Sequence, residues 1–183
     1  FRAKTRRREG GAVLMGASSR RNGLILALAV FVIDQIVKYL VTGPIGLAIE
    51  GQSIELLPIF NLTLVHNFGV SLGMLTAESN TMRWGLVALT GAISVFVGGW
   101  LWRESNRTDV LGLGLVLGGA VGNLLDRVRF GYVVDFADLH FGDIRPFLVF
   151  NVGDAAITMG VLILLVRALF ARDRANEAEN ENA

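Results

Sequence analysis

The chain has 183 residues, of which 52% are hydrophobic and 18% are charged, and its formal net charge is +1. Soluble domains carry about 25% charged residues, so this composition predicts a membrane protein and argues against a soluble enzyme. The sequence contains no cysteine, which excludes disulfides, thiolate metal sites, a cysteine nucleophile and lipid modification of this chain as a lipoprotein.

The first segment, residues 1–22, is basic and contains seven of the seventeen Lys and Arg residues. We expect it to lie in the cytoplasm and assign it no role in the fold beyond its positive charge. Because the chain begins with Phe1 and Met15 could serve as a start, residues 1–14 are expected to be an upstream extension or a fragment edge.

Four apolar stretches follow, each of roughly the length that crosses about 30 Å of hydrocarbon as a helix. They are residues 23–41, 84–102, 110–125 and 147–166. The third stretch is short and rich in glycine, and its glycines at 114, 118 and 122 recur every four residues. Such a stripe of small residues lets a neighbouring helix approach closely. The predicted fold class is therefore an all-α membrane protein with four transmembrane helices.

The connections between these stretches indicate orientation and a second structural element. Lys and Arg are enriched before residue 23, in the 103–109 connection and after residue 166, which predicts that both termini are cytoplasmic. Three arginines in the 127–146 connection weaken this signal. Short strand-like runs at 51–60, 59–67 and 132–139 predict a small extracytoplasmic β-cradle, built from residues 43–82 and 128–146. We expect residues 23–170 to form one membrane domain, and the polar tail 171–183 to be disordered.

Several polar residues lie where insertion into a bilayer costs about 2.5–3.5 kcal/mol for each charge. Asp34 and Lys38 are four residues apart, so they share one helix face and can pair. They could form a structural ion pair or be part of a functional site. Asn123, Asp126 and Arg127 share another face at the end of the third stretch. Their structural alternative is a polar plug between helices, in which Asp126 pairs with an arginine.

Two further carboxylates need an explanation, and no Lys or Arg shares the helix face of Asp154 within the fourth stretch. Asp135 lies in the strand-like "VVDF", and Asp154 lies about seven residues into the fourth stretch, one turn after Asn151. If Asp135 folds onto the end of that stretch, the two carboxyls meet and cannot both ionise. One acid beside one base can activate water, as in aspartic proteases. The structural alternative is a protonated Asp154 hydrogen-bonded to Asn151.

Four blocks of the sequence together resemble one protein family. They are "DQIVK" (34–38), "HNFG" (66–69), "GNLLDRVRFGYVVDF" (122–136) and "FNVGDAAI" (150–157). In type and order they are similar to signal peptidase II, the lipoprotein signal peptidase of bacteria. The resemblance implies a four-helix aspartyl protease of the inner membrane with a periplasmic β-cradle. It would cut prolipoproteins on the N-terminal side of a diacylglyceryl-modified cysteine, with its active site near the periplasmic face.

The resemblance also implies roles for individual residues. Asp135 and Asp154 match the catalytic dyad of the family. Four residues match positions that orient the substrate and the dyad, namely Asn67, Asn123, Arg127 and Asn151. Asp34, Lys38 and Asp126 match positions that support the structure or the edge of the site. The implied partners are a prolipoprotein and the bilayer, without nucleic acid, metal or cofactor, and we expect a monomer.

The chain departs from the family pattern at two places. The block after Asn67 reads "NFGVSLG", so Val70, Ser71 and Leu72 replace the usual small residues and aromatic residue. Gly153 stands where the family commonly has alanine before the second aspartate. We expect altered packing of the loop against the substrate, and no loss of catalysis.

Three other functions fit parts of the sequence less well. Asp135 and Asp138 could begin a magnesium site, but few basic residues that could bind phosphate surround them. Buried acids also mark proton-coupled carriers, although four spans are few for a carrier. A serine hydrolase would use Ser71 and His66, but no G-x-S-x-G motif surrounds that serine.

Overall fold

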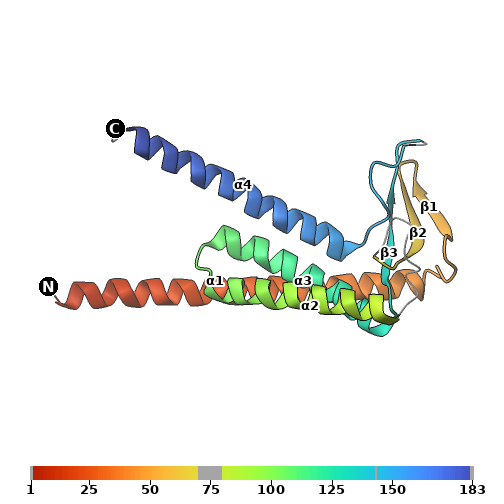
Figure 1. The fold of residues 1–183 in the computed structure, drawn as a ribbon, viewed down its shortest axis with the longest axis horizontal. Coiled ribbons are helices and arrows are strands. Elements are labelled where there is room, and N and C mark those ends of the chain that lie inside the picture. The colour runs from red at the N-terminus through yellow and green to blue at the C-terminus, as the bar shows by residue number, and fades with distance from the viewer. Residues whose placement is uncertain (1, 70–79, 143, 182–183) are drawn as a thin grey trace.

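The computed structural model describes residues 2–69, 80–142 and 144–181, with side chains for residues 19–69, 80–142 and 144–170. Helices run alongside one another in this part of the chain, and a small sheet lies at one end of them (Figure 1). The helices are α1 (Arg2–Thr42), α2 (Asn80–Arg103), α3 (Arg107–Arg129) and α4 (Val152–Glu181). The strands are β1 (Ser53–Leu57), β2 (Phe60–Asn67) and β3 (Val133–Leu139).

Each helix contains a stretch that is long and apolar enough to span a membrane. These stretches are Ser19–Thr42, Asn80–Arg103, Arg107–Arg129 and Val152–Phe170. The predicted fold class, four transmembrane helices with a small sheet, is therefore confirmed. Helices satisfy all of their backbone hydrogen bonds within one segment, which is why a lipid-facing chain adopts them.

The start of the fourth helix differs from the prediction. The apolar run begins at Phe147, but α4 begins at Val152 because the preceding residues are held by the sheet. The backbone N–H groups of Phe136 and Ala137 donate to the carbonyl of Phe150, at 3.1 and 2.8 Å. Asp154 therefore lies in the first turn of the helix, and not two turns into it as expected.

The helix α4 also continues beyond the predicted span. Residues 171–181, for which the polar composition predicted disorder, are helical in the structure. Alanine, arginine and glutamate, all good helix formers, make up most of this segment, which contains neither glycine nor proline. At its other end the chain is also helical from Arg2, where no structural role was assigned.

Glycines on α3 let it pack closely against two of its neighbours. The predicted stripe of Gly114, Gly118 and Gly122 faces α1, as a Cβ on Gly122 would lie 2.6 Å from the Asp34 carboxylate. A second pair, Gly112 and Gly119, faces α4. The close approach on both sides makes α3 the most buried of the four spans.

Replacement of Gly118 by valine is expected to destabilise the fold by about 1–3 kcal/mol, the typical cost of overpacking. A Cβ on Gly118 would lie 2.8 Å from the Cβ of Val30 and would also meet the backbone of Ala27. Thermal unfolding in detergent measures the effect. Gly99→Val on α2 is the matched control, because among the described residues no atom beyond the adjoining helix backbone lies within 4 Å of a Cβ built there. Equal losses in the two variants would contradict the packing argument.

The sheet is antiparallel in the order β1-β2-β3, which confirms the predicted strands. Asp135 of β3 lies opposite Val65 of β2, and Asn67 lies opposite Val133. One sheet face packs on the end of α1 through Leu64, Val134 and Val41. The strands run across the helix axes at the end of the bundle (Figure 1). This packing brings β3 against the first turn of α4.

Candidate active site

The nine predicted site residues lie on five elements that meet beneath the sheet. They are Asp34 and Lys38 on α1, Asn67 on β2, Asn123, Asp126 and Arg127 on α3, Asp135 on β3, and Asn151 and Asp154 at the start of α4. Side-chain hydrogen bonds and ion pairs join eight of them into one network. Arg127, the ninth, donates to the Asn123 carbonyl, and Asp34 also accepts a hydrogen bond from the backbone of α4. The positions that sequence analysis selected are therefore neighbours in space.

Asp135 is a buried carboxylate, with 1% of its surface exposed. One of its oxygens accepts a hydrogen bond from Asn67 Nδ2 at 2.9 Å, and the other accepts one from Asn151 Nδ2 at 2.6 Å. Burial and the nearby Asp154 raise the pKa of Asp135 to about 6, against the opposing effect of these two amide donors. This carboxyl can therefore hold a proton close to neutral pH.

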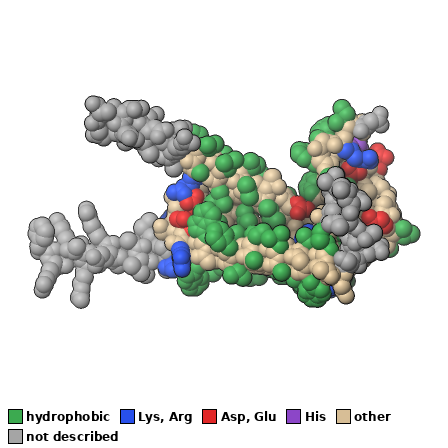
Figure 2. Space-filling model, viewed as in Figure 1, with side chains coloured by type: hydrophobic (Ala, Val, Ile, Leu, Met, Phe, Trp, Pro, Cys, Tyr) green, Lys and Arg blue, Asp and Glu red, His purple; other side chains and the backbone are tan. Residues whose placement is uncertain are grey.

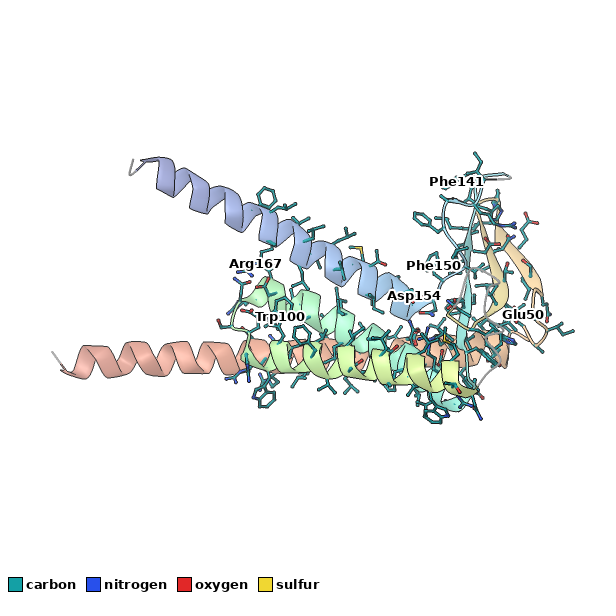
Figure 3. The ribbon with its side chains drawn as sticks, viewed as in Figure 1. Glu50, Trp100, Phe141, Phe150, Asp154 and Arg167 are labelled. Atoms are coloured by element: carbon teal, nitrogen blue, oxygen red, sulfur yellow. The ribbon has the colours of Figure 1, made fainter. Side chains whose placement is uncertain are left out.

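Asp154 is bound to the end of its own helix. Asn151 accepts a hydrogen bond from the Asp154 backbone N–H at 2.9 Å, and the Asp154 carboxylate accepts one from the Asn151 N–H at 3.3 Å. This reciprocal arrangement is a capping box, which fixes both side chains at the start of the helix. The other Asp154 oxygen accepts a hydrogen bond from Asn123 Nδ2 at 2.8 Å. Asp154 is thus held at the sheet end of α4, where it is hydrogen-bonded to α3 (Figure 3).

Asn151 connects the two carboxylates. Its Nδ2 donates to Asp135 and, at 3.1 Å, to Asn123 Oδ1, and its Oδ1 binds the Asp154 backbone. Asn123 in turn donates to Asp154. Both carboxylates therefore have Asn151 as a direct neighbour, although they are nineteen residues apart in the chain. The structure brings together the two acids whose meeting the sequence left open.

A buried charge cluster lies behind this pair. Lys38 Nζ lies 2.8 Å from Asp34 and 2.7 Å from Asp126, and all three side chains are almost completely buried. Lys38 also donates to Asn123 Oδ1 at 3.0 Å, which fixes the amide that binds Asp154. The Asp34–Lys38 pair was predicted, whereas the suggested pairing of Asp126 with an arginine was wrong. Asp126 pairs with Lys38 because α1 packs against the face of α3 that carries Asp126.

Arg127 reaches the site without a hydrogen bond to either carboxylate. Its Nη1 donates to the carbonyl of Asn123 at 3.3 Å, and its buried Nε has no hydrogen-bond partner within the described part of the chain. Sequence analysis missed two supporting residues. Gln35 donates to Asp34 and Asp126, and Arg83 donates to the Arg127 carbonyl at 2.9 Å. Gln35 lies within the "DQIVK" block, which could have identified it, whereas no sequence signal marked Arg83.

An apolar groove of about 320 Å³ opens beside Asp154. The surface is hollowed between the sheet and α4 (Figure 2). The groove is bounded by the segment that follows β3 and by the first turns of α4, with Asp154 as the acidic group in its wall. Its lining residues are Leu139, Phe147, Leu148, Phe150, Asp154, Ala155, Thr158 and Met159. Such a groove offers an apolar ligand a place next to a carboxylate.

Comparison with known proteins identifies the family. Residues 26–170 match the family model described as signal peptidase (SPase) II. The chain belongs to the signal peptidase II family. It is 54% identical to the lipoprotein signal peptidase of Sphingopyxis alaskensis, over 87% of this chain and 91% of that protein. It is 52% identical to that of Rhizorhabdus wittichii, over 88% of this chain and 93% of the relative.

Solved structures of this architecture agree with the assignment. A bacterial membrane enzyme determined by the in meso method at 2.3 Å resolution superposes with a TM-score of 0.70 and 27% identity, covering 85% of this chain and 90% of the other. A second such structure, at 1.9 Å resolution, gives the same TM-score with 28% identity. As a signal peptidase II, the protein is a multi-pass membrane peptidase of the aspartic type that removes signal peptides from prolipoproteins.

The departures from the signal peptidase II pattern have different outcomes. A Cβ on Gly153 would lie 3.0 Å from Asn151 Oδ1 and 3.1 Å from the Gly119 carbonyl, so this chain packs α4 more closely on α3 than an alanine readily allows. Val70, Ser71 and Leu72 lie outside the described residues, and with them the suggested serine nucleophile.

The family assignment also favours a peptidase over the carrier and the metal enzyme. Asp135 and Asp138, the suggested magnesium ligands, bind different partners, as Asp138 accepts from Thr63 at 3.2 Å and from Arg145 at 3.3 Å. Among the residues described, no group of three or more His, Asp or Glu side chains is arranged to hold a metal ion.

Proposed function

We propose that Asp135 and Asp154 are the catalytic dyad, and that they hydrolyse the peptide bond on the N-terminal side of a diacylglyceryl-modified cysteine. The observation that carries this proposal is the shared neighbour Asn151, which binds both carboxylates at the edge of an apolar groove. Two carboxyls in one site divide the roles of acid and base, because both cannot be charged at once.

The surroundings of the two carboxyls suggest which takes each role. Asp135 is buried, its pKa is raised to about 6, and it starts the reaction as the acid. Asp154 lies in the groove wall and starts as the base. Asp154 removes a proton from water as the water oxygen attacks the scissile carbonyl, whose oxygen takes the proton of Asp135. As the tetrahedral intermediate collapses, Asp154 gives its proton to the cysteine nitrogen and a hydroxyl of the intermediate returns a proton to Asp135. The C–N bond breaks, and the signal peptide leaves as a carboxylic acid.

The remaining network keeps the dyad in position. Asn67, Asn123 and Asn151 donate amide hydrogens to the two carboxylates and so fix their orientation. The groove beside Asp154 takes the acyl chains of the substrate, which brings the lipid-modified cysteine to the dyad. Binding of the acyl chains removes apolar surface from water and supplies affinity without contacting the reacting bond.

In our proposal both termini are cytoplasmic and the dyad lies near the periplasmic face of the inner membrane. The concentration of basic residues before residue 23 supports this orientation, as basic segments stay on the cytoplasmic side. We also propose that the chain acts as a monomer, since one copy can supply all nine proposed site residues.

The proposed substrate is tested with two peptides of the same prolipoprotein sequence, one with a diacylglyceryl cysteine and one with an unmodified cysteine. The purified enzyme is expected to cleave the lipid-modified peptide at least about tenfold faster, because only that peptide fills the apolar groove. Mass spectrometry of the products locates the cut. Equal rates, or a cut elsewhere in the peptide, would refute the proposal.

The proposed roles predict a pH dependence. The raised pKa of Asp135 means that the protonated acid is abundant below about pH 6 and is lost as the pH rises. We therefore expect kcat/KM to fall above about pH 6, approaching tenfold for each pH unit, since the acid form falls by that factor. Initial rates in buffers from pH 5 to pH 9 measure the profile. A rate that is constant or rises across this range would show that Asp135 is not the acid.

A further inference from the structure

Two loops lie side by side at the end of the sheet that is remote from the helices. Leu57 at the end of β1 pairs with Phe60 at the start of β2, and Phe60 pairs with Leu139 at the end of β3. The His140 N–H donates to the Ile59 carbonyl at 3.0 Å and joins the turn to the following loop. We call the described residues of 56–59 and 141–148 the sheet tip.

The sheet tip exposes an unusual amount of apolar surface. Seven large hydrophobic side chains on it have between 45% and 79% of their surface exposed: Leu56, Leu57, Ile59, Phe141, Ile144, Phe147 and Leu148. Hydrophobic side chains are visible at this end of the sheet in Figure 2. Exposed apolar side chains gathered at one end of a protein in this way mark a contact with another molecule or with a membrane.

The position of the tip relative to the spanning helices indicates that it meets the membrane surface. The helices that span the bilayer set the direction of the membrane normal, and the strands run across them, so the sheet extends along the membrane surface (Figure 1). Phe147 and Leu148 belong to the tip and also line the groove. Met159 of α4, which is exposed, lines the same groove. The apolar surface of the tip thus continues into the lipid-facing surface of a spanning helix.

The charges at the tip also suit a membrane surface. Arg145 has 63% of its side chain exposed while its Nε lies 3.3 Å from the buried Asp138. An arginine so placed can neutralise its partner and still reach anionic lipid phosphates. The acidic side chain on β1, Glu55, lies next to Ile54, which packs on the sheet core, so it projects from the opposite face of the strand.

We propose that the sheet tip inserts into the interfacial layer of the bilayer, with its seven apolar side chains among the lipids. This contact is a second membrane attachment, separate from the four spans. It holds β3, and with it Asp135, at a fixed height above the first turn of α4.

Fluorescence labelling tests the insertion. The chain has no cysteine, so Ile144→Cys and Glu55→Cys each introduce one thiol for a nitrobenzoxadiazole label in the full-length protein. The labelled proteins are reconstituted in vesicles of phosphatidylethanolamine and phosphatidylglycerol. We expect lipids with a nitroxide near the start of the acyl chain to quench the label at 144 several-fold more than the label at 55. Aqueous iodide is expected to show the opposite preference.

Two outcomes would overturn the proposal. If iodide quenches both labels equally, the tip lies in water. If neither quencher reaches the label at 144, another copy of the protein covers the tip. A second variant tests the apolar side chains directly. The double variant Phe141→Ser, Ile144→Ser removes two of the seven apolar side chains, and neither of the two lines the groove. In that background, nitroxide lipids are expected to quench a label at Leu57→Cys less than they do in the protein without the two serines. Unchanged quenching would contradict insertion.

Discussion

Asp135→Asn and Asp154→Asn are each expected to lower the rate of prolipoprotein cleavage by at least about 10³-fold. Asparagine has the size of aspartate but can neither give up nor take up a proton at neutral pH, so each variant lacks one of the two proton transfers. The assay follows conversion of a diacylglyceryl-modified prolipoprotein on a gel, with substrate in excess over the enzyme. Both variants are expected to bind the substrate, because most of the side chains that line the groove are apolar.

Asp138→Asn is the matched control for the dyad. Asp138 lies on the same strand as Asp135 and is 2% exposed, but its carboxylate binds Thr63 and Arg145 instead of the dyad network. We expect this variant to keep a rate within a few-fold of the parent. A dyad variant that retains a tenth of the parent rate while remaining folded would refute the assignment of that residue. A comparable loss in Asp138→Asn would show that the assay reports damage to the sheet and not loss of a catalytic acid.

Lys38→Met is expected to lower the free energy of unfolding by about 3–5 kcal/mol, the usual cost of removing one partner from a buried ion pair. The substitution would leave the buried carboxylates of Asp34 and Asp126 near each other without a cation. It would also remove the hydrogen bond that fixes Asn123. Unfolding of the purified protein in mixed micelles with increasing SDS measures the loss.

A combined variant separates charge from packing in this cluster. Asp34→Asn, Asp126→Asn and Lys38→Met together remove all three charges and nearly preserve the side-chain volumes. We expect the triple variant to recover most of the stability that Lys38→Met loses, because replacing a whole buried ion cluster by neutral groups is often neutral. If the single and triple variants unfold at the same SDS fraction, the loss comes from packing around residue 38. If Lys38→Met unfolds like the parent, the cluster contributes nothing to stability.

The fold could be predicted well where a single segment decides its own structure. The four spans follow from hydropathy and length, since a chain in lipid must satisfy its backbone groups within each helix. The stripe of Gly114, Gly118 and Gly122 correctly predicted a close helix contact, although the four-residue spacing does not say which helix makes it. Strands β2 and β3 were located within one or two residues by their composition.

Errors arose where residues distant in the chain compete for the same backbone or charge. Phe147 and Leu148 are apolar enough to begin a span, but Phe150 forms backbone hydrogen bonds with β3, and the Asn151–Asp154 capping box starts the helix at Val152. The choice of Lys38 as the partner of Asp126 likewise depends on which helix packs on α3. Neither result can be obtained from local periodicity.

The amino-acid sequence by itself thus determined that this protein spans a membrane four times, and which polar residues are too costly there to lack a purpose. Only the tertiary structure decided that Asp135 and Asp154 both contact Asn151, that Lys38 joins two carboxylates, and that the apolar residues of two loops gather at one end of the sheet. The physical reason is that hydropathy and backbone preference act within a segment. The pairing of buried charges and amides instead depends on which segments pack together.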